Sequence, residues 1–142
     1  MGKKRIVKKG GDSAGAGSAS SSRQSKRRLE SGILNVEATY NNTKVSLADA
    51  LGNIVTWSSA GSLGFAGAKK GTPFAAAKVG ELVGERAAGM GVKEVSVVVA
   101  GVGAGRESSI RAFSTKGIAI SSIKDMTPVP HNGPRPPKPR RV

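Results

Sequence analysis

The sequence predicts an α/β domain, a mixed five-stranded sheet with two flanking helices, between a flexible basic arm (residues 1–31) and a Pro/Arg-rich tail (residues 125–142). Three segments between residues 34 and 59 alternate apolar and polar residues, as half-buried strands do. Two segments with helical signals follow, and each leads into a further strand candidate. Both ends lack a hydrophobic period, so the folded domain is expected to span residues 32–124.

The first three strands should form an antiparallel meander. Alternation over residues 34–40 predicts the first strand, with Tyr40 on its apolar face. The stretch "YNNTK" then favours a turn, because Asn tolerates left-handed backbone conformations. A second strand leads through the turn "DALGN" to a third over residues 54–59. Trp57 shares one face of that strand with Val55 and is expected in the core.

The first helix should begin at Thr72-Pro73, an N-cap followed by proline in the first helical position. We expect it to end near Met90, stopped by Gly89 or Gly91. Its expected core-facing residues are Val79, Leu82, Val83 and Met90. Gly80 and Gly84 lie one turn apart inside it, and each costs about 1 kcal/mol relative to alanine. We therefore expect another backbone to approach this face, with the sheet as the expected partner.

The second half of the domain should supply two more strands around the second helix. The nearly continuous apolar run of residues 95–100 is typical of a central strand covered on both faces. The glycine loop "GVGAGRES" then leads into a helix over residues 106–115 and a last strand over 118–123. Strands one, four and five are expected to be parallel neighbours joined by right-handed crossovers, with the meander to the side.

The positive charge is concentrated outside the expected domain. The net charge is +14, of which residues 1–31 carry +7, residues 32–124 carry +4 and residues 125–142 carry +3. Two cationic extensions on a domain favour a polyanionic partner, because each Lys or Arg that neutralises a phosphate releases condensed counterions.

The composition argues against catalysis, metal sites and membranes. There is no cysteine, and His131 is the single histidine, so no metal or other cofactor is expected. The glycine loop lacks the Lys-Ser/Thr of a phosphate-binding P-loop and the G-x-G-x-x-G spacing. A Mg²⁺-dependent nuclease or NTPase is the weaker alternative, and a DNA-compacting architectural protein is the stronger one. No apolar run suits a membrane span, and the Ser- and Arg-rich start is compatible with a basic arm or an organelle transit peptide.

Two loops carry residues that suit RNA. Phe65, Lys69, Lys70 and the helix start at Thr72 combine an aromatic ring, two cations and an anion-attracting helix terminus. The ring of Phe65 is equally compatible with a lid folded back on the core. The glycine loop, with Arg106 and Arg111, suggests a cradle for a backbone phosphate.

Four collinear motifs resemble one protein family. They are "YNNTKVSLADALGN", "GFAGAKKGTPFAA", "GVGAGRESSIRA" and "IKDMTPVPHNGPRPPKPRRV". Together they resemble protein eleven of the small ribosomal subunit, in its bacterial form, over residues 32–142. The chain departs from that family at Ala66 and Ala100, where relatives commonly carry basic residues, and at Pro134, where they often carry Cys.

The resemblance implies a ribonuclease-H-like sheet without nuclease activity, in a structural constituent of the small ribosomal subunit. It implies binding of 16S-type rRNA on the platform, near the messenger exit where the Shine–Dalgarno helix forms. It also implies small-subunit proteins seven and eighteen as neighbours, and a cytoplasmic ribosome, with an organellar one not excluded. The proline-rich tail would then be an extended arm among RNA helices.

The motifs and the resemblance together define the candidate RNA-binding residues. Arginines and lysines are assigned to phosphates, and Asn and His side chains to sugars or base edges. The candidates are Asn41, Asn42, Phe65, Lys69, Lys70, Thr72, Gly103, Gly105, Arg106, Arg111, His131, Asn132, Arg135, Lys138, Arg140 and Arg141.

Overall fold

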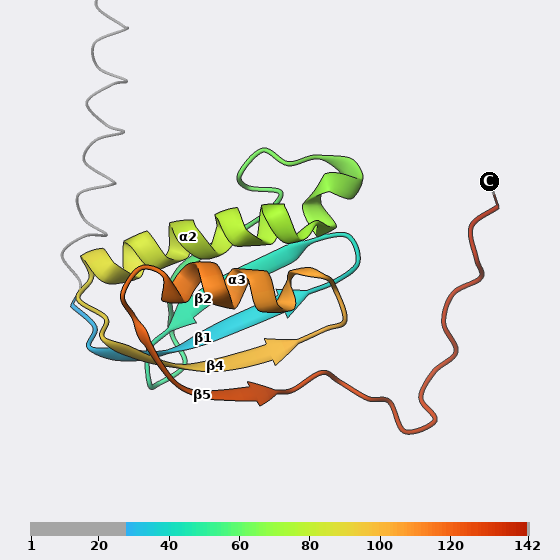
Figure 1. Cartoon of the computed structure of the whole chain (residues 1–142). Helices are drawn as coiled ribbons and strands as arrows, with labels where there is room; N and C mark the ends of the chain where they lie inside the picture. Colours follow the sequence, from blue (N-terminus) through green and yellow to red (C-terminus); the bar gives the residue numbers. More distant parts are fainter. Residues whose placement is uncertain (1–27, 142) are drawn as a thin grey trace, which may run out of the picture.

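The computed structural model describes residues 28–141, in which a five-stranded sheet carries two long helices on one side (Figure 1). The elements in order are β1 (Ser31–Ala38), β2 (Thr43–Ala48), β3 (Ile54–Ser59), the 3-10 helix η2 (Gly67–Gly71), α2 (Pro73–Gly89), β4 (Glu94–Ala100), α3 (Gly105–Ser114) and β5 (Ala119–Asp125). The predicted α/β class is therefore confirmed. Residues 1–27 of the predicted basic arm lie outside the described residues, whereas Leu29 already packs against the core.

The strand order β3-β2-β1-β4-β5 confirms the predicted meander with parallel strands beside it. β2 runs antiparallel to both β1 and β3, while β4 runs parallel to both β1 and β5. Leu34 in β1 lies opposite Leu47 on one side and Val97 on the other, and all three are fully buried. This apolar row runs across the middle of the sheet and anchors the core.

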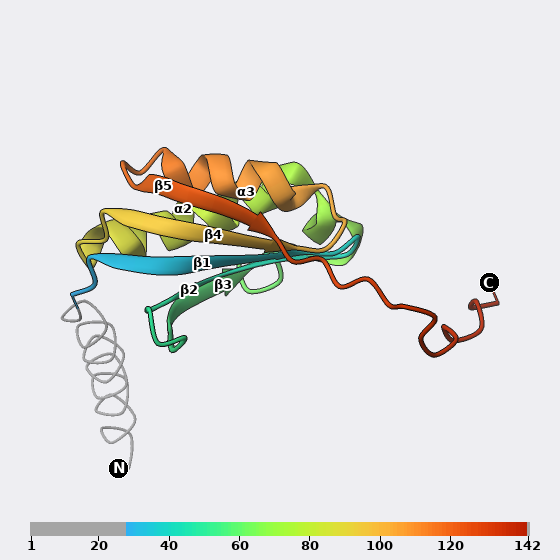
Figure 2. The same cartoon turned by 90° about the horizontal axis from the view of Figure 1, so that it is seen from below.

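Only one face of the sheet is covered by helices, as the two views in Figures 1 and 2 show. On that face Val95, Val97 and Val99 of β4 are at most 3% exposed. The alternate residues of β4, among them Ser96 and Val98, are half-buried on the opposite face, which we call the open face. The prediction that both faces of β4 are covered is thus wrong. The connection from β3 to β4 through α2 and the connection from β4 to β5 through α3 place both helices on the same side of the sheet. The apolar run in β4 therefore does not indicate a second covering layer.

The two helices pack closely against each other through glycine. A Cβ atom on Gly80 would lie 2.2 Å from the carbonyl oxygen of Ser109 in α3. One turn later, a Cβ on Gly84 would lie 3.2 Å from the carbonyl oxygen of Phe113. The close approach expected at these glycines is present, but the partner is α3 rather than the sheet. Ser109 is small and its hydroxyl donates to the Gly105 carbonyl at 2.8 Å, so this hydroxyl has a hydrogen-bond partner at the contact.

Both ends of α2 follow the sequence signals. The Thr72 hydroxyl accepts a hydrogen bond from the Ala75 N–H at 3.3 Å, and Pro73 is the first helical residue. The helix ends at Gly89, and Gly91 follows with φ of +85°, a conformation that favours glycine. The expected core-facing residues Val79, Val83 and Met90 are buried, while Leu82 is half-buried.

Trp57 is 53% exposed, which contradicts the expectation that it lies in the core. A shift in the β2–β3 register inserts Val55 as an extra residue between the pairs Ala48–Ile54 and Leu47–Thr56. One inserted residue reverses the facing of the side chains that follow it. Consequently Thr56 and Ser58 face the core, and Trp57 points outward.

Tyr40 is also exposed, at 77%, instead of continuing the buried face of β1. The strand ends at Ala38, because the Thr39 N–H donates to the Asn42 carbonyl at 2.8 Å and starts the turn. Tyr40 therefore sits at the tip of the β1–β2 turn.

The glycine contact between the helices leads to a stability prediction. Gly80→Ala should lower the free energy of unfolding by about 2 kcal/mol, because the overlap with Ser109 outweighs the roughly 1 kcal/mol of helix propensity gained. The matched control is Gly89→Ala in the same helix, where nothing lies within 4 Å of the added Cβ. Urea denaturation should show this control at or above wild-type stability. Equal effects at both positions would contradict the glycine contact.

Candidate nucleic-acid interface

The parallel strands β1, β4 and β5 all end at the same edge of the sheet, and the loops that follow them meet there (Figure 1). The starts of α2 and α3 lie at this edge as well. We call it the loop end and define it as residues 39–43, 65–74, 101–106 and 125–127. Most sequence candidates within the domain converge here, as expected for loops at the carboxyl ends of parallel strands.

The β1–β2 turn is closed by its own hydrogen bonds. The Thr39 hydroxyl accepts from the Asn42 N–H at 3.1 Å, and the Asn42 side-chain oxygen accepts from the Thr43 N–H at 3.0 Å. Asn42 therefore serves the turn, whereas the exposed side chains of Tyr40 and Asn41 remain available to a ligand. Tyr40 was not a sequence candidate, because its position continues the apolar alternation of the strand.

The loop before α2 presents cations beside an aromatic pair. Phe65 is half-buried against the core and meets Phe74 edge-to-face, with 6.1 Å between ring centroids. The structure thus shows the lid arrangement for Phe65, while Phe74 is 64% exposed and was not a candidate. Lys69 and Lys70 lie in the last turn of η2, and Thr72 is occupied as the N-cap of α2. Within residues 28–141, neither lysine belongs to an ion pair.

The glycine loop packs tightly against the β1–β2 turn. A Cβ on Gly101, which has φ of +99°, would lie 2.1 Å from the Ala38 carbonyl oxygen. One on Gly103 would lie 2.2 Å from the Thr39 carbonyl oxygen, and one on Gly105 would overlap the Thr43 side chain. These glycines face protein backbone and side chains, so close packing accounts for the glycine spacing. The loop presents Val102, 59% exposed, toward solvent.

Arg106 binds groups within the protein. Its Nη2 lies 2.7 Å from the Asp125 carboxylate, and its Nη1 donates to the Gly101 carbonyl and to the Thr127 hydroxyl. The other oxygen of Asp125 accepts from the Thr127 N–H at 2.9 Å and from the Thr127 hydroxyl at 2.6 Å. We call Arg106, Asp125 and Thr127 the tail clasp.

The clasp lowers the pKa of Asp125 to about 2, chiefly through the hydrogen bonds from Thr127 and then through Arg106. Asp125 and Thr127 were not candidates, although an Asp two residues before a hydroxyl is a recognisable signal for a side-chain-closed turn.

Arg111 differs from Arg106 although both lie on α3. Its side chain is 81% exposed and lies 3.6 Å from Glu107, one turn earlier on the same helix. It is not part of the loop end. Exposed pairs of this kind contribute little to stability, so the guanidinium of Arg111 can exchange Glu107 for another anion at low cost.

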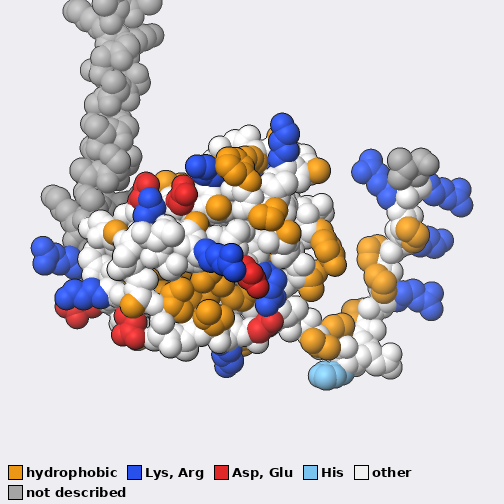
Figure 3. All heavy atoms as spheres, in the orientation of Figure 1, with side chains coloured by type: hydrophobic (Ala, Val, Ile, Leu, Met, Phe, Trp, Pro, Cys, Tyr) orange, Lys and Arg blue, Asp and Glu red, His pale blue; other side chains and the backbone are white. Residues whose placement is uncertain are grey.

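The tail leaves the domain after β5 and carries its cations away from it (Figures 1 and 3). Of residues 126–141 only Thr127 is half-buried, and the others are exposed. His131 and Asn132 lie at a bend, where Asn132 has φ of +56°. Four cations and no acid occur in this stretch, and none of the cations forms an ion pair: Arg135, Lys138, Arg140 and Arg141.

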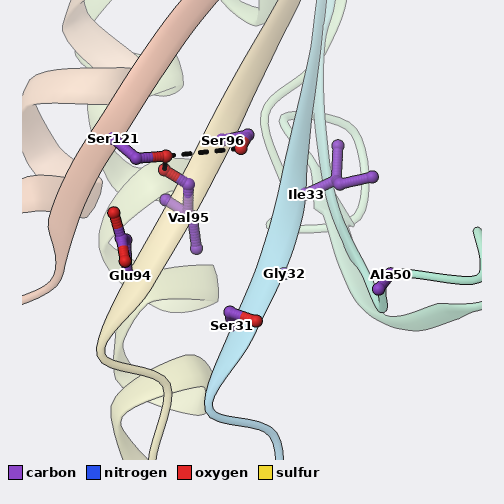
Figure 4. Close-up of a pocket in the computed structure, with 8 residues that line it drawn as sticks. All are labelled: Ser31, Gly32, Ile33, Ala50, Glu94, Val95, Ser96 and Ser121. Carbon is purple, nitrogen blue, oxygen red and sulfur yellow. Dashed lines mark hydrogen bonds between the residues drawn. The ribbon is translucent and has the colours of Figure 1, made fainter.

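A hollow of about 310 Å³ lies on the open face, at the edge of the sheet opposite the loop end. The residues that line it include Ser31, Glu94 and Ser121 (Figure 4). Two of its serine hydroxyls bond within the protein, because Ser121 donates to the Val95 carbonyl at 3.1 Å and lies 3.3 Å from the Ser96 hydroxyl. Over residues 28–141, no three His, Cys, Asp or Glu side chains gather to hold a metal ion, and no helix is long and apolar enough to cross a membrane.

Comparison with known proteins identifies the family. A family model described as Ribosomal protein S11 matches residues 32–141. The chain belongs to the ribosomal protein S11 family. It is accordingly a non-enzymatic, structural constituent of the small ribosomal subunit, which confirms the resemblance seen in the four motifs.

The S11 relatives are similar over most of the chain. Small ribosomal subunit protein uS11 of Synechococcus sp. is 52% identical over 120 residues, which is 84% of this chain and 92% of the relative. The protein of the same name from Gloeobacter violaceus is 52% identical over 117 residues, 82% of this chain and 90% of its own. The one from Acaryochloris marina is 50% identical over 123 residues, 87% of this chain and 95% of its own.

The clasp of this S11 protein leads to a pH prediction. Because the pKa of Asp125 is depressed from 3.8 to about 2 in the folded state, the carboxylate stabilises the fold above about pH 4 and loses this effect as the pH falls toward 2. Asp125→Asn should therefore be less stable than wild type at pH 6, and the gap should close between pH 4 and pH 2. Urea titrations across this range would measure it.

The control for this measurement is Glu107→Gln, which removes an exposed carboxylate of α3 from its ion pair with Arg111. This variant should stay close to wild type throughout. A gap for Asp125→Asn that does not change between pH 6 and pH 2 would contradict the role given to the carboxylate.

Proposed function

We propose that this S11 protein binds the 16S-type rRNA of the small subunit through its loop end and its tail. The observation that carries the proposal is the free tail, in which residues 128–141 contact no part of the domain by hydrogen bond or ion pair. A cationic segment that is exposed and forms no hydrogen bond or ion pair with its own domain is available to neutralise phosphates.

Proline prepares the tail for this task. Six of the seven prolines lie between residues 128 and 139, where they restrict the backbone and remove N–H donors. A segment already restricted to extended conformations loses less entropy when it becomes ordered on a ligand. The tail can therefore bind along RNA grooves without first forming secondary structure.

The proposed contacts divide by chemistry. Exposed Asn41, with His131 and Asn132, offers hydrogen bonds to sugars or base edges, and Tyr40 adds an exposed ring for stacking. Asn42, Phe65, Thr72, Gly103 and Gly105 shape the loop end. Phosphates are assigned to Lys69, Lys70, Arg111, Arg135, Lys138, Arg140 and Arg141.

The location within the subunit rests on the family resemblance. We propose the platform near the messenger exit, beside the region of the Shine–Dalgarno helix, with small-subunit proteins seven and eighteen as neighbours. Ala66 and Ala100 both lie at or next to the loop end, where relatives commonly carry basic residues. This chain should accordingly make fewer phosphate contacts there than those relatives.

The two rival functions find no support at the interface. Asp49, one acid a nuclease would need, accepts hydrogen bonds from the Leu51 and Asn53 N–H groups and holds the β2–β3 turn. Glu107, the other acid considered for a nuclease, lies in the first turn of α3 and pairs with Arg111. A DNA-compacting protein would need only positive charge to bind its nucleic acid. Membership of the S11 family and the exposed ring of Tyr40 instead favour structured RNA with unpaired bases as the ligand.

Removing residues 128–142 tests the tail while leaving the clasp in place. With about seven phosphates neutralised, log affinity for 16S-type rRNA should fall with log salt at a slope of roughly −5 to −6, and the truncation should make this slope less negative by about 3. Affinity near 150 mM salt should drop by more than about tenfold.

Filter-binding isotherms across salt, with duplex DNA as competitor, would measure both quantities, and circular dichroism should show an intact domain. The control is the full-length chain with four cations changed to Gln, which removes the same four positive side chains as the truncation: Arg135, Lys138, Arg140 and Arg141. Unchanged rRNA binding by the truncated chain, or equal affinity for duplex DNA, would refute the proposal.

Tyr40 provides a second test at the loop end. Tyr40→Ala should weaken rRNA binding by about 1–3 kcal/mol, the usual value of one base stacked on an aromatic ring. The unfolding free energy should change by less than about 0.5 kcal/mol, since the side chain is exposed. Tyr40→Phe should bind like wild type. The control is Trp57→Ala, another exposed ring in the middle of edge strand β3, which should leave rRNA affinity unchanged.

A further inference from the structure

We propose that Arg106 is a positioning residue that acts through the tail clasp: with Asp125 and Thr127 it fixes the direction in which the tail leaves the domain before RNA binds. This inference rests on the proposed function, because the direction of the tail matters only if the tail is a ligand-binding arm. It assigns to Arg106 a role within the protein in place of the phosphate contact expected from the sequence.

The clasp lies where the hydrogen bonds between β5 and the rest of the sheet end. The Met126 N–H donates to the Val99 carbonyl at 2.8 Å, which extends the β4–β5 ladder one residue beyond β5. Pro128 and Pro130 then remove the N–H groups that would continue it. Within the described residues no hydrogen bond holds the chain after Thr127, so the clasp sets the exit direction of the tail.

Thr127 makes every hydrogen bond that its hydroxyl allows. The hydroxyl donates to Asp125 at 2.6 Å and accepts from the Gly101 N–H at 3.2 Å and from Arg106 at 3.3 Å. It is also the one half-buried residue among residues 126–141. A side chain with a full set of partners at the root of an otherwise exposed tail restrains that root.

The clasp is fixed in turn to the rest of the loop end. Gly101 bonds it from both sides, since its carbonyl accepts from Arg106 and its N–H donates to Thr127. The next residues of the glycine loop rest on β1, where the Gly103 N–H donates to the Ala38 carbonyl at 2.8 Å. The tail root therefore moves with the β1–β2 turn that carries Tyr40 and Asn41, and the two proposed RNA-binding parts keep a set orientation.

A comparison with Arg111 separates the two roles. Both arginines lie on α3 and either could bind phosphate by sequence alone, but the side chain of Arg106 is 31% exposed against 81% for Arg111. Arg106 has three acceptors in the protein, and Arg111 has one distant carboxylate. A guanidinium already satisfied in this way gains little from a phosphate and loses the clasp by turning toward one.

Loss of the tail clasp should weaken RNA binding without changing its salt dependence. Without the clasp, the tail root must be ordered when RNA binds, and ordering about one residue corresponds to roughly tenfold in affinity. The number of phosphates contacted does not change, so the salt slope should stay at its wild-type value. Loss of affinity at constant slope distinguishes positioning from a direct phosphate contact.

The sharpest test is the isosteric pair Thr127→Val and Thr127→Ser in the full chain, bound to 16S-type rRNA across a range of salt. Thr127→Val keeps the charge and shape but loses the hydroxyl, and should bind about tenfold more weakly with an unchanged slope. Thr127→Ser keeps the hydroxyl and should bind like wild type. Asp125→Asn, which frees Arg106, should also weaken binding.

A measurement on the free protein completes the test. The chain has no cysteine, so spin labels can be placed at Ala88→Cys on α2 and Val129→Cys in the tail, both exposed positions. Their distance distribution should be narrow in the wild type and with Thr127→Ser, and broad with Thr127→Val and Arg106→Gln. Arg111→Gln removes the same charge from the same helix and should leave it narrow.

Two results would overturn the inference: a distribution that is equally broad in the wild type, or tighter RNA binding by Asp125→Asn together with a smaller salt slope for Arg106→Gln. The second result would make Arg106 a phosphate contact. Failure of the proposed function is recognised separately, because then removal of residues 128–142 leaves rRNA affinity unchanged whatever the spin labels show.

Discussion

The contact between the glycine loop and the end of β1 sets the relative positions of the β1–β2 turn, the start of α3 and the root of the tail. Glycine at residues 101 and 103 lets the loop approach the carbonyl oxygens of Ala38 and Thr39 more closely than any side chain would permit. From this contact α3 begins in a fixed place, and its start carries Arg106 toward the last residues of β5. The β1–β2 turn, the glycine loop and the root of the tail are thereby built as one unit.

Two different surfaces follow from placing both helices on one side of the sheet. The helix face is filled by small and branched side chains, and Gly80 lets α2 and α3 touch without a gap. The open face carries neutral side chains such as Asn35, Ser46 and Ser96, together with charged ones such as Glu37 and Lys44, which pair with each other. The exposed rings of Tyr40 and Phe74 lie instead at the loop end with Lys69 and Lys70, and four further cations lie in the tail. Under the proposed function, the partner is recognised through shape and charge, which requires no assembled catalytic group.

The topology could be predicted because it depends on patterns that extend over many residues. Alternation over residues 34–40, the Thr72-Pro73 helix start and the apolar run of β4 each describe a whole element, and together they fixed the order and class of the sheet. Trp57 could not be placed in this way, since one inserted residue at Val55 reverses the facing of β3 and leaves no trace in composition. The partner of Gly80 was equally hidden, because a small residue indicates a close approach but not what approaches.

The candidate site shows the same limit at the level of single side chains. Sequence patterns indicated Lys69, Lys70 and the tail cations as candidates, and in the described residues none of them forms an ion pair. They could not separate Arg106 from Arg111, since which acceptors surround a guanidinium depends on where distant elements meet. Asp125 and Thr127 come to Arg106 only through the β4–β5 pairing.

The strand order also constrains how this chain acquires its shape during synthesis. β1 lies between β2 and β4, so its second neighbour is made only after about sixty further residues have been added. The early meander has little against which to bury Leu34 and Val36, and closing the sheet must await β4. The basic tail follows β5 and is synthesised after the scaffold that orients it. The cations of the tail are therefore made only when the domain already has all the sequence it needs to fold.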